Sequence, residues 1–498
     1  MIAAMLGRWG RPTLDASVRF AAIAAPAGVG ALTAVSPVLA VVTMAGLGAL
    51  WLVSYGTAMI RVFHLGLVAI LIGYAFLGRG MAYVGVSPIF VGEMVLALAG
   101  IAILVSVPTA RWHPVHLVIG LFVAWGLYRT VPYIGRHGID AFRDGVSYGY
   151  AVFAIAVSLT VWRHHMEGIL RTYRRWIPLF VFWVPIAAIV SFTLSGVLPR
   201  VPGSDVPILV FKGGDTGVHL GAVGAFVLLG LGASTRTTVS DGIVWAGWLV
   251  AIGISAAVNR GGAVAASMMA AAILFGRGSI RWGSLVLVGL FLVAVVGLVD
   301  PQVDVGLARR ISLDQLVANV LSIVGGRSDP LLEGTKEWRL TWWTEIIRYT
   351  IGGEYMWTGK GFGINLADAD GFQVLADGSL RAPHNGHLEL LARGGVPALA
   401  LWVMVQLAFG LTMIRAAIRA RSVGATAWVA VTGWIVVYWL AMLVNASFDV
   451  YLQGPMGGIW YWSVIGLGIA VAGIIDEMVA RTPKGQMPAA VGSEGSVP

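Results

Sequence analysis

The segment IPLFVFWVPIAAIVSFTLS (residues 177–195) carries no charged side chain over a length that can cross the hydrocarbon core of a bilayer as a helix. It directly follows the strongly basic segment WRHHMEGILRTYRRW (162–176). Apolar stretches of roughly this length recur from one end of the chain to the other, which is the spacing that repeated membrane crossings require. The sequence therefore predicts an all-α polytopic membrane protein.

Composition narrows the class further. Of the 498 residues, 58% are hydrophobic and only 11% are charged, well below the quarter that is typical of soluble domains. There is no cysteine, so disulfides and thiolate metal sites are excluded. The net charge of +9 does not indicate nucleic-acid binding, because the basic residues lie between apolar stretches, where the positive-inside rule holds them.

Hydropathy predicts 12 to 14 membrane spans. The first apolar run contains AIAAPAGVGA, which resembles a signal-peptide cleavage region, but the run continues, so we expect an uncleaved span. The predicted spans are residues 18–34, 36–54, 60–78, 87–107, 114–134, 145–162, 177–195, 216–234, 241–257, 261–275, 282–299, 387–413, 425–445 and 455–475.

These spans divide the chain into four regions. We expect an N-terminal bundle of about 11 spans at 1–299, a large hydrophilic loop with short helices at 300–384, C-terminal transmembrane helices at 385–478, and a disordered tail at 479–498. The densest short basic segments occupy alternate loops, which lie on the same side of the membrane, so one orientation places all of them in the cytoplasm. In that orientation both termini are cytoplasmic and the loop 300–384 lies outside.

Within the loop, EWRLTWWTEIIRYTI (337–351) has the periodicity of an amphipathic helix. Trp338, Trp342, Ile346 and Tyr349 recur at helical spacing. Such a face fits a helix lying in the membrane interface, or a helix that caps the bundle.

The segment RAPHNGHLELLARGG (381–395) places a polar cluster where a late span begins. Asparagine is a favoured N-cap, so a helix starting after Asn385 would hold His384 at the membrane surface. A histidine in that position is most often a hydrogen-bonded surface residue, and only its context suggests more.

That context is a family resemblance. PHNGHLELLARGGVPALALW resembles the signature of the O-antigen ligase and O-antigen polymerase superfamily, with His384, Asn385, nine residues and Gly395. Other segments are similar to elements of the same superfamily, although Asn259 replaces a usual serine in the first of them. They are VNRGGAVAA (258–266), TKEWRLTWWTEII (335–347), GKGFGIN (359–365), NASFDVYLQGPMGGIWYW (445–462) and, more weakly, GIDAFRDGVSYGY (138–150).

The resemblance implies an inverting, metal-independent membrane glycosyltransferase of GT-C-like architecture, without a cofactor. Such enzymes take a glycan from undecaprenyl diphosphate at the periplasmic face of the bacterial inner membrane. A ligase passes it to lipid A–core, and a polymerase passes it to another lipid-linked repeat. The resemblance also implies that His384 is the base and that arginines hold the diphosphate.

This chemistry suits those residue types. A sugar joined to diphosphate already has a good leaving group, so the paired carboxylates of a glycosidase are not required. Histidine can take a proton from the attacking hydroxyl near neutral pH, and arginine binds phosphate bidentately without losing its charge. No Asp-x-Asp pair or His/carboxylate cluster is placed for a metal ion.

Three arginines are candidates for the diphosphate. Arg260 lies at the expected outer end of a span among small residues, Arg339 lies in the outer loop, and Arg143 is adjacent to Asp144, which could simply neutralise it.

Further polar residues border the expected outer ends of spans, and each has a structural alternative such as a local ion pair or a plain loop turn. They are Asn385, Glu389, Arg381, Glu93, Lys212, Asp215, His219 and Asp449.

The ionisable residues gather at one face and are scarce at mid-membrane, which disfavours a secondary transporter or a lipid-linked glycan flippase. A purely structural scaffold would not explain the polar cluster at 381–395. Of the two transferase activities the late His-Asn motif favours the ligase, and the polymerase remains the alternative.

Overall fold

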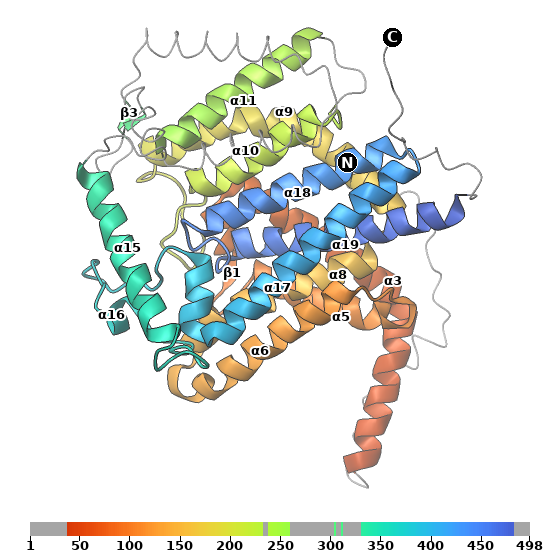
Figure 1. Ribbon diagram of the computed structural model, residues 1–498, viewed down its shortest axis with the longest axis horizontal. Coiled ribbons are helices and arrows are strands. Elements are labelled where there is room, and N and C mark those ends of the chain that lie inside the picture. The colour runs from red at the N-terminus through yellow and green to blue at the C-terminus, as the bar shows by residue number, and fades with distance from the viewer. Residues whose placement is uncertain (1–36, 233–237, 259–302, 305–309, 312–329, 483–498) are drawn as a thin grey trace, which may run out of the picture. The chain divides into compact units, whose positions relative to one another are not determined.

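The computed structural model describes residues 37–232, 238–258, 303–304, 310–311 and 330–482. These residues are overwhelmingly helical, which confirms the all-α polytopic prediction (Figure 1). Among them, seven helical segments are long and apolar enough to cross a membrane. They are Gly56–Leu77, Val91–Thr109, Pro114–His137, Arg163–Thr193, Gly386–Ser422, Thr426–Ala446 and Pro455–Arg481.

The chain separates into two compact units between Val62 and Phe63, and the second unit contains all of the candidate site residues. Helix α3 (Pro37–Leu77) begins in the first unit and ends in the second. It is continuous across the two predicted spans 36–54 and 60–78, so the prediction of a break between them is wrong. The predicted spans 18–34, 261–275 and 282–299 lie outside the described residues.

Helices make up most of the described part of the second unit. They are α4 (Arg79–Ala82), α5 (Val91–Ser106) with the 3-10 turn η1 (Val107–Thr109), α6 (Pro114–His137), α7 (Ile139–Gly149), α8 (Val152–Thr160), α9 (Arg163–Thr193), α10 (Gly213–Leu228), α11 (Thr238–Val258), α15 (Pro330–Thr350), α16 (Leu366–Asp370), α17 (Gly386–Ser422), α18 (Thr426–Ala446) and α19 (Pro455–Arg481). Two antiparallel strand pairs accompany them, β1 (Gly85–Val86) with β2 (Ile89–Phe90) and β3 (Val303–Asp304) with β4 (Arg310–Ile311).

The core forms around α19, which packs against α8, α17 and α18. Close approach to α8 requires small residues, because a Cβ at Gly466 would lie 2.7 Å from the carbonyl oxygen of Ala154. The predicted span 145–162 is corrected here: it is divided between α7 and the nine-residue α8, with the break at Tyr150–Ala151. Since α8 is buried among other helices, it needs no lipid-spanning length.

Loops predicted for one side of the membrane meet at one end of the bundle. Arg111, after η1, pairs with Glu477 near the end of α19 and lies 5.4 Å from the ring centre of Trp162 at the start of α9. Arg419, near the end of α17, pairs with Asp476. The basic region 162–176 therefore begins at this end of the bundle, and the basic region 414–422 lies at the same end. The start of α17, with His384 before it, lies at the opposite end.

Candidate active site

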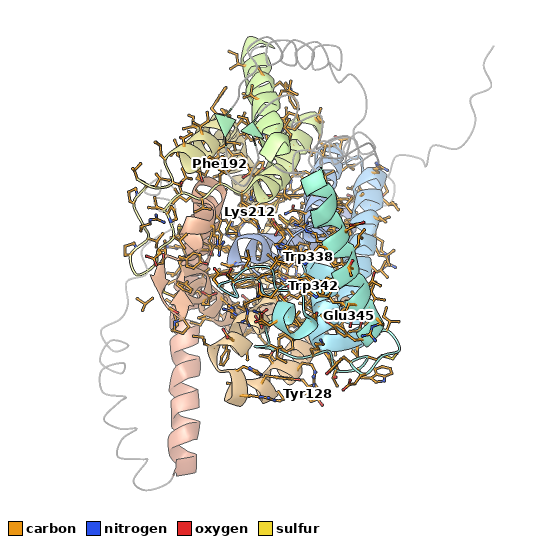
Figure 2. All side chains as sticks on the ribbon, turned by 90° about the vertical axis from the view of Figure 1, so that its left-hand side faces the viewer. Tyr128, Phe192, Lys212, Trp338, Trp342 and Glu345 are labelled. Carbon is orange, nitrogen blue, oxygen red and sulfur yellow. The ribbon has the colours of Figure 1, made fainter. Side chains whose placement is uncertain are left out.

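Helix α15 stands beside the beginning of α17 (Figure 1). Its aromatic face has the predicted spacing: Trp342, Ile346 and Tyr349 are buried and Trp338 is partly buried, packed against α16 and the first turns of α17. Figure 2 labels Trp338 and Trp342 on this helix. The face contacts protein, so of the two interpretations the capping helix is right and the helix lying with its aromatic face in the membrane interface is wrong.

Asp370, at the end of α16, ties α15 to the glycine-rich turn 359–365. Its Oδ2 atom accepts hydrogen bonds from Trp342 Nε1 at 2.6 Å and from the Tyr349 hydroxyl at 3.3 Å. The same carboxylate pairs with Lys360, whose ammonium lies 4.3 Å from the ring centre of Tyr349. The turn is thus fixed to the loop helices.

The other side of this turn packs on α17. Lys360 N–H donates to the carbonyl of Ala392 at 2.7 Å and Gly361 N–H to that of Arg393 at 3.1 Å. Gly361 has a φ of 98°, and a Cβ there would lie 2.1 Å from the Tyr133 ring, so only glycine fits. The resemblance of this turn to a family element thus coincides with a steric requirement of this fold.

A buried ionic cluster lies beneath the turn. Asp144 Oδ2 accepts from Arg393 Nη1 at 2.8 Å, from Gly363 N–H at 2.9 Å and from Arg381 Nη2 at 3.3 Å. Arg393 Nε also bonds Glu389 Oε1 at 2.8 Å. Because these groups neutralise one another, Arg381 and Glu389 serve to fix the segment that carries His384.

Arg143 lies at the exposed edge of this cluster. Its guanidinium is 3.1 Å from Asp140 and 3.7 Å from Asp144, and 53% of the side chain is exposed. The neutralising pair considered from the sequence is present, while the guanidinium stays accessible to solvent.

The start of α17 follows the capping prediction. The Asn385 side chain accepts hydrogen bonds from His387 N–H at 3.0 Å and Leu388 N–H at 3.1 Å, which confirms it as the N-cap. His384 precedes it with a φ of 52°, a strained conformation for a non-glycine residue. The Pro383 carbonyl accepts from Trp343 Nε1 at 2.8 Å, so His384 is held between two anchors.

The two histidines of this stretch have different surroundings. His387 Nδ1 accepts from Trp402 Nε1 at 3.0 Å, so its Nε2 carries the proton and faces Leu443 O and Ser447 Oγ, each at 3.2 Å. Both nitrogens of His387 are therefore engaged inside the protein. His384, by contrast, has 33% of its side chain exposed, and its Nδ1 lies 3.9 Å from Asp449 Oδ1.

Three residues flagged only as supporting candidates converge beside His384. Lys212 Nζ lies 2.6 Å from Asp449 Oδ2 and 3.6 Å from Asp215 Oδ1. Burial opposes the charge on Lys212, but the carboxylates of Asp215 and Asp449 outweigh it and raise the pKa of Lys212 above its ordinary value. Burial likewise opposes the charge on Asp449, yet the adjacent His384 and Lys212 hold the pKa of Asp449 below its ordinary range.

Arg339 reaches the same place from α15. Its Nη1 donates to the carbonyl of Phe448 at 3.2 Å, the residue directly before Asp449. Trp343, one turn further along α15, is the anchor of Pro383. One helix thus contacts both segments that carry the His384–Asp449 pair.

Two of the other candidates are engaged elsewhere. Glu93 accepts from Phe90 N–H at 3.1 Å and from the Tyr150 hydroxyl at 3.0 Å, and the buried His219 lies 2.5 Å from the Tyr438 hydroxyl. These contacts fit a structural role for Glu93 and for His219. Arg260, together with Asn259, lies outside the described residues.

Sequence reasoning missed the anchoring role of Trp343 and the central position of Asp144. The i, i+4 spacing of Arg339 and Trp343 was available as a signal, since it places both on one face of a helix. The central position of Asp144 had no such signal, because Gly363, Arg381 and Arg393, which surround it, are more than 200 residues away in the sequence.

Comparison with known proteins agrees with the resemblance. Residues 208–403 match the family model described as O-antigen ligase. No curated protein matches the chain. The matched segment contains Lys212, Arg339 and His384, whereas Arg143 and Asp449 lie outside it. With its apolar helices, this match indicates a multi-pass membrane protein that contains a segment similar to the O-antigen ligase family.

Proposed function

We propose that the chain transfers a glycan from undecaprenyl diphosphate to an acceptor hydroxyl at the periplasmic face of the bacterial inner membrane, with both termini in the cytoplasm. The acceptor we favour is lipid A–core, which makes the protein an O-antigen ligase. The observation that carries the proposal is the partly exposed, strained His384 beside Asp449, inside a chain with an O-antigen ligase match.

In this reaction His384 takes the proton of the acceptor hydroxyl as its oxygen attacks the anomeric carbon. The bond from that carbon to the diphosphate breaks, the configuration inverts, and undecaprenyl diphosphate leaves with one more negative charge. The carboxylate of Asp449, 3.9 Å from His384, stabilises the imidazolium that results.

The charge that builds up on the leaving diphosphate calls for cations. Arg339 has its guanidinium at the Phe448 carbonyl, beside the His384–Asp449 pair, and is the described arginine that we assign to the diphosphate. Arg260 remains assigned to the same task from its sequence position. Arg143 already pairs with Asp140 and Asp144, so it is the weakest of the three candidates for binding the diphosphate.

A small, mostly apolar cleft lies beside Lys212, at the side of the polar cluster. Apolar side chains from α3, α9 and the segment before α10 form most of its wall, and Lys212 and Asp215 lie among the lining residues. The apolar residues are Phe76, Trp183, Val184, Ala187, Leu209 and Phe211. Only the isoprene unit next to the diphosphate would enter this cleft, and it would keep the diphosphate near the polar cluster.

The polymerase reaction uses the same donor and the same base, so it remains the alternative. The test is purified protein in proteoliposomes with undecaprenyl diphosphate carrying one defined, fluorescent glycan, offered lipid A–core or a second lipid-linked glycan. We expect a labelled product with lipid A–core that survives EDTA. Product with the lipid-linked acceptor alone would assign the polymerase, and no product with either would refute the proposal.

A further inference from the structure

Asp449 lies between two partners at unequal distances. Its Oδ2 atom is 2.6 Å from Lys212 Nζ, whereas its Oδ1 atom is 3.9 Å from His384 Nδ1 and accepts from Val450 N–H at 2.8 Å. A direct hydrogen bond to the imidazole would need an approach of about 1 Å. In this arrangement the carboxylate of Asp449 therefore pairs more closely with Lys212 than with His384.

We infer that Lys212 is a substrate-sensing residue: the donor diphosphate draws Lys212 away from Asp449, and Asp449 then pairs with His384. The inference rests on the proposed function and deepens it, because it makes the basicity of His384 depend on the bound donor. Lys212 also becomes a ligand of the diphosphate, a role that the match to the family does not assign.

Lys212 is placed for such an exchange. It is the N-cap residue of α10, so its ammonium lies at a helix N-terminus, where an anion is favoured. Its side chain is 36% exposed, against 19% for Asp449, so the lysine is the more exposed member of the pair. A diphosphate carries more negative charge than one carboxylate and competes for the ammonium accordingly.

The other groups around Asp449 do not substitute for the lysine. Asp215 on α10 shares Lys212 at 3.6 Å and is itself bonded by Asn445 from α18 at 3.4 Å. Arg339 on α15 contacts the carbonyl of the preceding Phe448, and Tyr451 is neutral and buried. Once Lys212 turns to the diphosphate, the ionisable side chain left next to the Asp449 carboxylate is His384, which needs to move by only about 1 Å to form a hydrogen bond.

The kinetic test compares wild type, Lys212→Met and a matched control, Arg348→Met, which removes an exposed cation of α15 that pairs with Glu345. The acidic limb of kcat/KM reports the free enzyme and that of kcat the donor complex. A charge-neutralising partner lost from Asp449 favours the protonated imidazole, so Lys212→Met should move the kcat/KM limb up by about one pH unit. Its kcat limb should stay in place, and Arg348→Met should move neither.

Equal movement of both limbs would mean that Lys212 merely fixes Asp449 in every state, and no movement of either would also overturn the inference. A rise in KM for the donor of about tenfold should accompany the shift, since one charge-assisted contact is lost.

A second measurement needs neither turnover nor a variant. Diethylpyrocarbonate modifies neutral imidazole, and peptide mapping by mass spectrometry follows His384 alone. Undecaprenyl diphosphate should raise the pH midpoint of this modification in the wild-type protein by about one unit. An unchanged midpoint overturns the inference even if glycan transfer is observed, whereas absent transfer with a shifted midpoint refutes the proposed function only.

Discussion

Replacing Asp144 by asparagine should destabilise the protein far more than the same change at Asp140, one turn earlier on α7. Asp144 is 7% exposed and accepts from Arg393, Gly363 and Arg381 at 2.8, 2.9 and 3.3 Å. Asparagine can still accept from Gly363 N–H, but it loses the charge that two guanidinium groups face.

The size of the effect follows from burial. Breaking a buried ion pair costs about 3–5 kcal/mol, and Arg393 keeps Glu389 as a second partner, so we expect about 3 kcal/mol. Asp140 is 42% exposed and pairs with Arg143 at 3.1 Å, a contact worth at most about 1 kcal/mol.

Thermal unfolding followed by tryptophan fluorescence in detergent measures the difference. For a chain of this size, about 3 kcal/mol corresponds to a fall in Tm of roughly 3–6 °C for Asp144→Asn, against about 1 °C for Asp140→Asn. Equal shifts for the two variants would show that the buried cluster does not join α7 to α17 and would refute the reasoning.

Two further changes test other parts of the site. Gly395→Ala should lower Tm by several degrees, because Gly395 has a φ of 72° and a Cβ there would lie 2.6 Å from the Met356 carbonyl oxygen. The control Gly100→Ala should leave Tm unchanged, because the space around Gly100 is open. Similar shifts in Tm for both variants would count against the steric argument. Arg339→Lys should raise KM for the donor about tenfold with little change in Tm, since lysine keeps the charge but not the bidentate geometry; donor titration measures this, and an unchanged KM would rule out a clamp at this arginine.

Local rules predicted the parts of the site that local chemistry decides. The cap at Asn385 follows from a side chain that bonds its own helix start, and the buried face of α15 follows from a period of 3.6 residues. Neither needs knowledge of distant residues.

Hydropathy mispredicted the helix boundaries at two places, where backbone continuity or burial among other helices sets them. Composition gave two spans at 36–54 and 60–78, yet nothing in the chain between them interrupts α3. At 145–162 the apolar run is long enough for a span, but it is split because α8 is buried against α19.

The pairings within the site lay beyond sequence reasoning for a different reason. Lys212 and Asp449 could each be placed at the end of a span, but their contact joins residues more than 230 positions apart. Likewise the sequence offered Asp144 only its neighbour Arg143, whereas the fold supplies Arg381 and Arg393.

Glycan transfer by a His384→Asn variant tests the central claim most directly. Asparagine tolerates the left-handed backbone at this position, so the start of α17 should be preserved and Tm should match wild type. We expect transfer to fall by at least about 100-fold, as the loss of a general base implies. Transfer at the wild-type rate would show that the acceptor proton goes elsewhere.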